Sequence, residues 1–138
     1  AIDTSDLGLE KLQNRAINEK LNIKTVCMDL NHWIVSEKYD VIMASYLHMF
    51  KDEREELFKK IEDSLSSDGY FIAEFFSTKQ ISFNSGGPKD LDLLYTIEDF
   101  SNHFNLCKKN ITEEIVVLDE GIGHQGEACV IRVVIQKI

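Results

Sequence analysis

The sequence has few of the residues that mark linkers, disulfide frameworks or membrane spans. One proline and seven glycines are spread over 138 residues, which leaves no Pro/Gly-rich linker between domains. No apolar run approaches the ~20 residues of a membrane-spanning helix, and no segment resembles a signal peptide. We therefore expect one domain over residues 1–138, cytoplasmic, with no membrane partner.

Cysteine and basic charge are also scarce. The three cysteines are odd in number and far apart, and Cys27 and Cys129 lie in apolar runs, so we expect small core residues rather than disulfides or metal ligands. The formal net charge is −9, which repels phosphate backbones at long range. The composition therefore favours a small-molecule partner and argues against a nucleic acid.

Apolar spacing predicts helices and strands in alternation through the first half. Leu9, Leu12, Ala16 and Leu21 recur at helical spacing, and Thr4 or Ser5 is a natural N-cap for this helix. Residues 39–45 form a short apolar run, as in a strand covered on both faces. The run 51–56 is the solvated face of a second helix, which turns Leu57, Phe58, Ile61 and Leu65 inward.

The second half predicts a strand, an irregular loop and a hairpin. Residues 70–76 form a strand, and residues 77–95 form a long irregular segment. Thr96 and Asp99 stand at capping-box spacing at the start of a short helix. Residues 111–118 and 128–138 are two β-rich runs with only nine residues between them, which predicts an antiparallel pair. Alternating strands and helices imply an α/β fold with a doubly wound, mostly parallel sheet.

The strand ends resemble those of the class I S-adenosylmethionine-dependent methyltransferases, whose sheet also finishes with an antiparallel hairpin. The start of the chain is similar to the end of the family's second strand, which implies that Asp3 and Thr4 contact the cofactor ribose. Met28-Asp29-Leu30 is similar to the third strand's end, which implies adenine contacts from Asp29 and Leu30. Ala44-Ser45-Tyr46-Leu47-His48 matches the fourth, so Ser45 and His48 are expected beside the cofactor's methionine part.

The second half resembles, within that family, the tellurite-resistance and thiopurine methyltransferases. The residues that carry the resemblance are Glu74-Phe75-Phe76, Gln80, Gly86-Gly87-Pro88-Lys89, Asp92-Leu93-Leu94 and the segment Glu120-Gly121-Ile122-Gly123-His124-Gln125-Gly126. The resemblance implies that Gln80, Gly86, Gly87 and Arg132 lie on the substrate side and that Glu74 and His124 serve the chemistry.

One part of the family pattern is missing. The first strand and its glycine loop have no counterpart here, so we expect an N-terminally truncated sheet. A folded chain would borrow a strand from a partner, form a homodimer across the gap, or belong to a longer protein. The run from Gly121 to Gly126 spells G-x-G-x-x-G but joins two strands, so it cannot place a helix N-terminus against a phosphate.

Each candidate carboxylate or cation also has a structural explanation. Asp3 can favour the start of the first helix, and Asp29 can cap a turn at Asn31. Glu74, among apolar neighbours, is either a base whose pKa burial raises or a paired structural acid. Arg132 either faces inward to bind an anion or lies on a solvated strand face.

The aromatic candidates are open in the same way. His48 follows a strand end, where open sheets bind ligands, but is as easily a packed side chain. His124 lies among glycines beside Glu120 and Glu127, which suits the edge of a site. His103 is expected to be structural, and Trp33 to cover the core.

These observations favour methyl transfer from S-adenosylmethionine to a small soft nucleophile, a thiol or a chalcogen oxyanion. Alignment of the reacting atoms would supply most of the acceleration, since a soft anion needs no strong base. The alternatives are a non-catalytic remnant or binding module with the same fold, and a nicotinamide-dependent oxidoreductase. The oxidoreductase would end in a further parallel strand.

Overall fold

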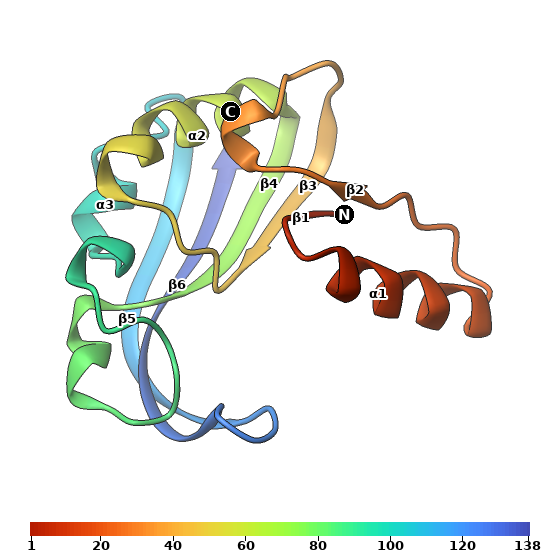
Figure 1. Cartoon of the computed structure of the whole chain (residues 1–138). Helices are drawn as coiled ribbons and strands as arrows, with labels where there is room; N and C mark the ends of the chain where they lie inside the picture. The colour runs from red at the N-terminus through yellow and green to blue at the C-terminus, as the bar shows by residue number, and fades with distance from the viewer. The chain divides into compact units, whose positions relative to one another are not determined.

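The chain divides into two compact units, Ala1–Ile34 and Val35–Ile138, in a computed structural model that describes all 138 residues (Figure 1). The first unit contains β1 (Ile2–Asp3), α1 (Asp6–Asn18), β2 (Val26–Cys27) and the 3-10 helix η1 (Leu30–His32). β1 and β2 pair in parallel as a two-stranded sheet of their own.

The first unit is held together by local contacts. Of the two predicted N-caps, Thr4 and Ser5, the structure uses Ser5, whose hydroxyl accepts a hydrogen bond from the Gly8 amide at 3.0 Å. The helix α1 buries Leu9 and Ala16. Cys27 is exposed, so its prediction as a core residue is wrong. Its strand has two residues and a single neighbour, which leaves the side chain without full cover.

The second unit contains a four-stranded mixed sheet. Its elements are β3 (Tyr39–Ser45), α2 (Lys51–Ser64), β4 (Leu65–Phe76), η2 (Thr78–Ser82), η3 (Leu91–Leu93), α3 (Ile97–Ser101), β5 (Cys107–Asp119) and β6 (Gln125–Lys137). The strand order is β3-β4-β6-β5. β3 and β4 are parallel, whereas β6 runs antiparallel to both β4 and β5.

This sheet confirms part of the predicted topology. The antiparallel hairpin is present. The final strand, β6, is antiparallel to its neighbours, whereas a nicotinamide-dependent oxidoreductase would end in a parallel strand. The prediction of a mostly parallel sheet is only partly confirmed, because parallel and antiparallel pairs are equally frequent. No strand joins the two sheets, and β3 ends the larger one. A partner strand along β3 remains a prediction.

An aromatic core lies between one face of this sheet and its helices. Phe58 of α2 and Phe100 of α3 have their ring centroids 5.2 Å apart, and Phe100 lies 5.2 Å from Phe75 of β4. Phe104 packs against Phe71 at 5.6 Å. In Figure 1, α2 and α3 lie beside the sheet formed by β3 to β6.

The start of α3 agrees with the prediction, whereas the burial of one side chain in α2 does not. Thr96 caps α3 in the predicted capping box with Asp99. The run 51–56, predicted to be solvated, contains Arg54, which is only 2% exposed. That prediction is wrong for Arg54 because the segment 92–99 lies against the first turn of α2 and offers the guanidinium its oxygens. None of the helices has the length and apolar character that crossing a bilayer requires.

Candidate functional site

The carboxyl ends of β3 and β4 meet at one edge of the larger sheet. Ser45, the last residue of β3, is the register partner of Glu74. The next residue, Tyr46, turns the chain with a positive φ of 48°, and its amide donates to the Glu74 carbonyl at 2.8 Å. A non-glycine residue in this region of backbone space is strained, and such strain gathers at functional sites.

Four aromatic side chains gather at this edge, and we call them the Phe76 cluster: Tyr46, His48, Phe76 and His124. Tyr46 stacks on Phe76 with centroids 4.6 Å apart. His48 lies parallel to Phe76 at 6.3 Å, and His124 lies 6.5 Å from Phe76 and 6.4 Å from Tyr46. His48 and His124, 76 positions apart in sequence, therefore flank the same ring.

Gly86 and Gly87 bring backbone against this cluster. Both have positive φ, of 114° and 81°. A Cβ on Gly87 would lie 2.8 Å from the Phe76 ring, and one on Gly86 would lie 2.8 Å from the Gly123 carbonyl and 3.3 Å from the His124 ring. Both positions therefore require glycine. The predicted substrate-side glycines do lie at the Phe76 cluster.

Gln80 lies behind this surface rather than on it. Its side chain is fully buried, and its amide nitrogen donates to Ser85 Oγ and to the Gly86 carbonyl, each at 3.0 Å. Its amide oxygen accepts from the Cys129 amide at 2.8 Å. The predicted substrate contact from Gln80 is therefore wrong, because every polar atom of the amide is already used. Gln80 instead fixes the 80–86 segment to β6.

Glu74 is ionised and fully engaged. The Tyr46 hydroxyl donates to Oε1 at 2.5 Å, and Arg132 Nε donates to Oε2 at 2.7 Å. Burial alone would raise the pKa of Glu74, but the hydrogen bonds from Tyr46 and Arg132, together with the Arg132 charge, lower it. Of the two alternatives for Glu74, the structure supports the paired acid rather than the base with a raised pKa, because the register that pairs Glu74 with Arg132 supplies the cation.

Arg132 has the second of its two predicted orientations, on the solvated face of its strand. Its side chain is about half exposed, at 48%, yet it bridges Glu74 and Glu114, the latter at 3.2 Å. The three residues form a charged row across β4, β6 and β5. An anion that approached Arg132 would have to compete with two carboxylates already in place.

Two further side chains at the edge, His48 and Tyr46, have shifted pKa values. Partial burial lowers the pKa of His48 below its usual value; a hydrogen bond with the Leu93 backbone opposes this, and the nearby His124 adds to it. His48 is therefore neutral at neutral pH. Burial, and then the bond to Glu74, raise the pKa of Tyr46, so its hydroxyl remains a donor.

His103, a further aromatic residue, has a structural role. His103 Nδ1 lies 2.7 Å from the Asp99 carbonyl, and its ring packs on the edge of Phe58, as the structural prediction for His103 requires. Tyr46 and Phe76 were not singled out as site residues from the sequence. The one available signal was their place at strand ends, since the register that brings them together is long-range.

The candidate cofactor residues of the first unit lie at the ends of its parallel strands. The carboxylate of Asp3 accepts from the Ser5 amide, and that of Asp29 accepts from the Asn31 amide, both through Oδ1 at 2.8 Å. Each aspartate therefore caps a turn and keeps Oδ2 available. Thr4 follows β1, and its carbonyl accepts from the Cys27 thiol at 3.6 Å.

The neighbours of Asp29 are partly exposed. Leu30 begins η1, and its carbonyl accepts from the Trp33 amide. Trp33 is half-buried, and its role as a cover for the core remains a prediction. A separate open hollow of about 380 Å³ between α1 and β2, lined by residues such as Leu9, Gln13 and Cys27, includes none of the candidate site residues.

Comparison with solved structures gives the same fold. TehB from Haemophilus influenzae has a TM-score of 0.77 and 18% identity over 99% of this chain and 49% of its own. The N-methyltransferase NodS from Bradyrhizobium japonicum has a TM-score of 0.71 and 8% identity, covering 99% and 71%. An S-adenosylmethionine-dependent methyltransferase from Clostridium acetobutylicum has a TM-score of 0.68 and 16% identity, covering 99% and 74%.

These similarities establish the fold of the class I methyltransferases, and the chain spans about half the length of TehB. A search among curated proteins finds no match. The family model described as "Methyltransferase domain" matches residues 1–69, which is half of the chain and includes the strand ends at Asp3, Asp29 and Ser45. The chain therefore belongs to the methyltransferase domain family.

Proposed function

We propose that this domain takes part in S-adenosylmethionine-dependent methyl transfer to a small soft nucleophile, a thiol or a chalcogen oxyanion. The observation that carries the proposal is the Phe76 cluster with Gly86 and Gly87 against it. The segments that carry the resemblance to the tellurite-resistance and thiopurine methyltransferases contribute Phe76, the two glycines and His124. Segments distant in sequence thus supply one small aromatic surface.

The first unit offers groups that fit the cofactor's sugar and base. Asp3 and Asp29 follow neighbouring parallel strands, and each keeps one carboxylate oxygen without an internal partner. A carboxylate at a strand end is a strong acceptor for ribose hydroxyls or an adenine amino group. When bound, S-adenosylmethionine supplies an electrophilic methyl group on a sulfonium.

The edge of the larger sheet suits an acceptor that needs little base catalysis. Glu74 is held ionised between Tyr46 and Arg132, which makes it a poor proton acceptor. The neutral imidazole of His48 is the better group to take a proton from a thiol, and His124 is the alternative. A thiolate or an oxyanion needs neither, so positioning against Tyr46, His48 and the two glycines, which surround the buried Phe76 ring, would supply most of the rate.

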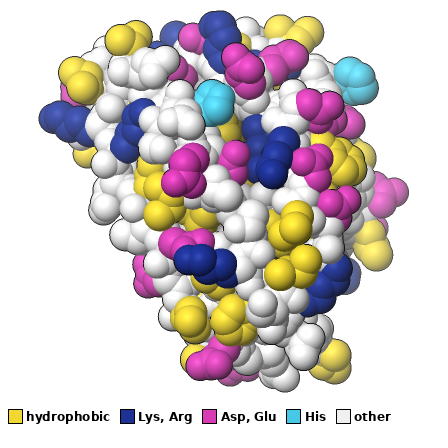
Figure 2. Space-filling model, turned by 90° about the vertical axis from the view of Figure 1, so that its left-hand side faces the viewer, with side chains coloured by type: hydrophobic (Ala, Val, Ile, Leu, Met, Phe, Trp, Pro, Cys, Tyr) yellow, Lys and Arg dark blue, Asp and Glu magenta, His cyan; other side chains and the backbone are white.

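The acidic surface agrees with a small acceptor rather than a nucleic acid. The net charge is −9, and over the face seen in Figure 2 acidic and basic side chains alternate with apolar ones. That face has no continuous basic area of the kind that binds phosphate backbones.

The test is transfer of a labelled methyl group to thiols, selenite and tellurite. We expect turnover with at least one of them, and a loss of roughly 10²- to 10⁴-fold in kcat/KM for a protic acceptor in His48→Gln, as for loss of a general base. His103→Gln is the matched control, because His103 lies in the helical core, and it should retain activity. Absence of turnover on every soft acceptor would reject the proposal.

A binding module without catalysis is the second candidate. The observation that favours it is the hydrogen bonding of both Glu74 oxygens, one by Tyr46 and one by Arg132, because a carboxylate held in this way is a poor proton acceptor. Calorimetry separates the two candidates. A module of this kind binds S-adenosylmethionine or its demethylated product but releases no labelled product in the assay above.

A further inference from the structure

Arg54 is a buried cation in the first turn of α2. It is 2% exposed and is among the largest fully buried side chains of the protein. Removing a guanidinium from water costs several kcal/mol unless hydrogen bonds replace the lost hydration. The contacts of Arg54 should therefore show which parts of the chain it holds together.

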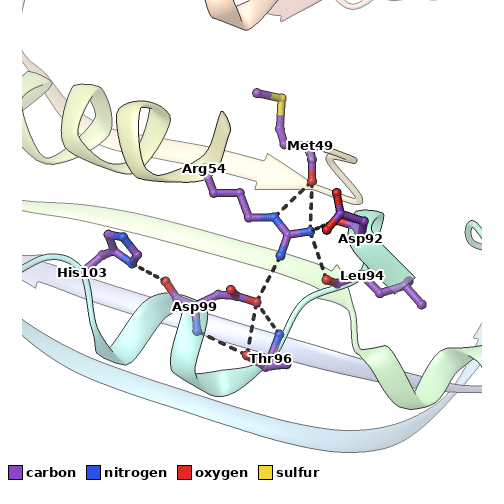
Figure 3. Close-up of polar contacts among 7 residues, drawn as sticks. All are labelled: Met49, Arg54, Asp92, Leu94, Thr96, Asp99 and His103. Atoms are coloured by element: carbon purple, nitrogen blue, oxygen red, sulfur yellow. Dashed lines mark hydrogen bonds and ion pairs between the residues drawn. The ribbon is translucent and has the colours of Figure 1, made fainter. Parts of the chain in front are cut away.

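The guanidinium donates hydrogen bonds to three backbone carbonyls in two separate segments of the chain (Figure 3). Nε and Nη2 donate to the Met49 carbonyl at 3.0 and 2.9 Å. Nη2 also donates to the carbonyls of Asp92 at 2.6 Å and Leu94 at 3.0 Å. Arg54 thus joins the loop that follows β3 to the segment around η3.

Two side chains complete the surroundings of the guanidinium. Nη1 donates to Asp99 Oδ2 at 3.1 Å, and that oxygen also accepts from the Thr96 amide at the start of α3. The Tyr95 ring lies beneath the guanidinium, 3.8 Å from its carbon to the ring centroid. This stacking fixes the plane of the fork, so its donors point in set directions.

The three carbonyls belong to residues next to His48 or next to its hydrogen-bond partner Leu93. Met49 is the residue after His48, and Asp92 and Leu94 stand on either side of Leu93, whose backbone forms a hydrogen bond with the His48 ring. One guanidinium therefore sets both the backbone that carries His48 and the backbone group that His48 contacts. His48 itself lies parallel to Phe76 at the candidate site.

We propose that Arg54 is a positioning residue that holds His48 in place over Phe76 by fixing the Met49 loop against the 92–94 segment. The value of this placement for methyl transfer rests on the proposed function, but the placement itself does not. Lysine cannot replace arginine here, because an ammonium has three donors and no planar fork, whereas Arg54 uses three nitrogens on four oxygens.

The experiment compares Arg54→Lys with Lys59→Met in the full chain. Lys59 lies on the same helix, is exposed and pairs only with Asp63, so its loss removes a charge from α2 without touching the loops. The readout is NMR of the histidine rings: the titration of His48 and its contact with Phe76. His32 of the first unit serves as internal reference.

In Arg54→Lys we expect the contact between His48 and Phe76 to weaken and the His48 pKa to move up toward its usual value. Partial burial, which lowers the His48 pKa, has a larger effect than the Leu93 hydrogen bond, which raises it. A ring released from both and exposed to water should therefore have a higher pKa. His32 should not change, and Lys59→Met should leave both histidines as in the wild type. If methyl transfer is observed, Arg54→Lys should lose roughly 10- to 100-fold in kcat/KM.

An unchanged His48 titration and an unchanged His48–Phe76 contact in folded Arg54→Lys would overturn the proposal. If that variant does not fold, Tyr95→Leu provides the test, because it removes the ring beneath the guanidinium and keeps every carbonyl. It should move His48 in the same direction, and no movement would again overturn the proposal. A wild type without turnover rejects the proposed function alone, since the histidine readout needs no substrate.

Discussion

The two units of the chain differ in how much hydrophobic core each has inside it. In Ala1–Ile34 the buried hydrophobic side chains are Leu9 and Ala16, and each strand has two residues. In Val35–Ile138 the buried side chains include five phenylalanines in contact and the apolar centres of β4 and β6. The second unit has a core, whereas the first is mainly a helix with capped turns.

The candidate functional groups follow the same division. Asp3 and Asp29 are exposed carboxylates whose internal partners are neighbouring amides. Tyr46 and His48 pack against Phe76, and Glu74 is part of the charged row. Changes in the first unit should therefore affect binding with little effect on stability, and changes in the second should affect stability first.

The largest expected effect is a cavity in the core of the second unit. Phe71 is fully buried and packs on Phe104, so Phe71→Ala should lower the free energy of unfolding by ~3–5 kcal/mol. Leu9→Ala in the first unit should cost clearly less, because α1 is only partly covered. Urea unfolding measures both, and equal losses would remove the contrast between the units.

A smaller loss is expected where backbone meets the Phe76 cluster. Gly87→Ala places a methyl group 2.8 Å from the Phe76 ring at a φ of 81°, and should destabilise by about 1–3 kcal/mol. Gly121→Ala is the matched control, with a φ of 100° but no atom within 4 Å, so it should cost only the backbone strain of ~1 kcal/mol. A larger cost at Gly121 would mean that the glycines beside Phe76 are not set by packing.

The charged row predicts a pH dependence for Glu74→Gln. The pKa of Glu74 is lower in the folded chain, so its ionised form stabilises the fold above the unfolded pKa, and this contribution disappears as the pH falls through the folded pKa. At pH 7 the variant should be less stable by about 1.5–3 kcal/mol, the value of a hydrogen bond to a charged group. The difference in free energy of unfolding between the two proteins should be smaller at pH 3 than at pH 7. An equal difference at both pH values would contradict the assignment.

Local patterns predicted much of the fold. The Ser5 cap, the Thr96–Asp99 capping box and the antiparallel hairpin each depend on residues close in sequence, and each was predicted. The site was less predictable, because its properties depend on strand register. Glu74 lies opposite Arg132, 58 residues away, and that pairing decides between the two alternatives that the sequence left open for Glu74.

Burial of polar side chains was the least predictable feature. Arg54 lies in a run of charged residues whose pattern predicts a solvated helix face, and Gln80 lies in a segment that the sequence predicts to be irregular. Both are fully buried because carbonyls and amides from distant segments satisfy their donors and acceptors. No periodicity in the sequence records those partners.

The smallest expected effect on stability belongs to the first unit, where the effect on binding should be largest. Asp3→Asn keeps an oxygen that can accept from the Ser5 amide, so stability should change by no more than about 0.5 kcal/mol. Loss of the charge should weaken binding of S-adenosylmethionine by roughly tenfold or more, since a hydrogen bond to a charged group contributes ~1.5–3 kcal/mol. Asp6→Asn is the matched control, an exposed aspartate in the first turn of α1 that bonds its own neighbour at Leu7. Calorimetry should show weaker binding for Asp3→Asn alone, and equal affinities for the two variants would mean that the carboxylate at the end of β1 has only the structural role of a cap.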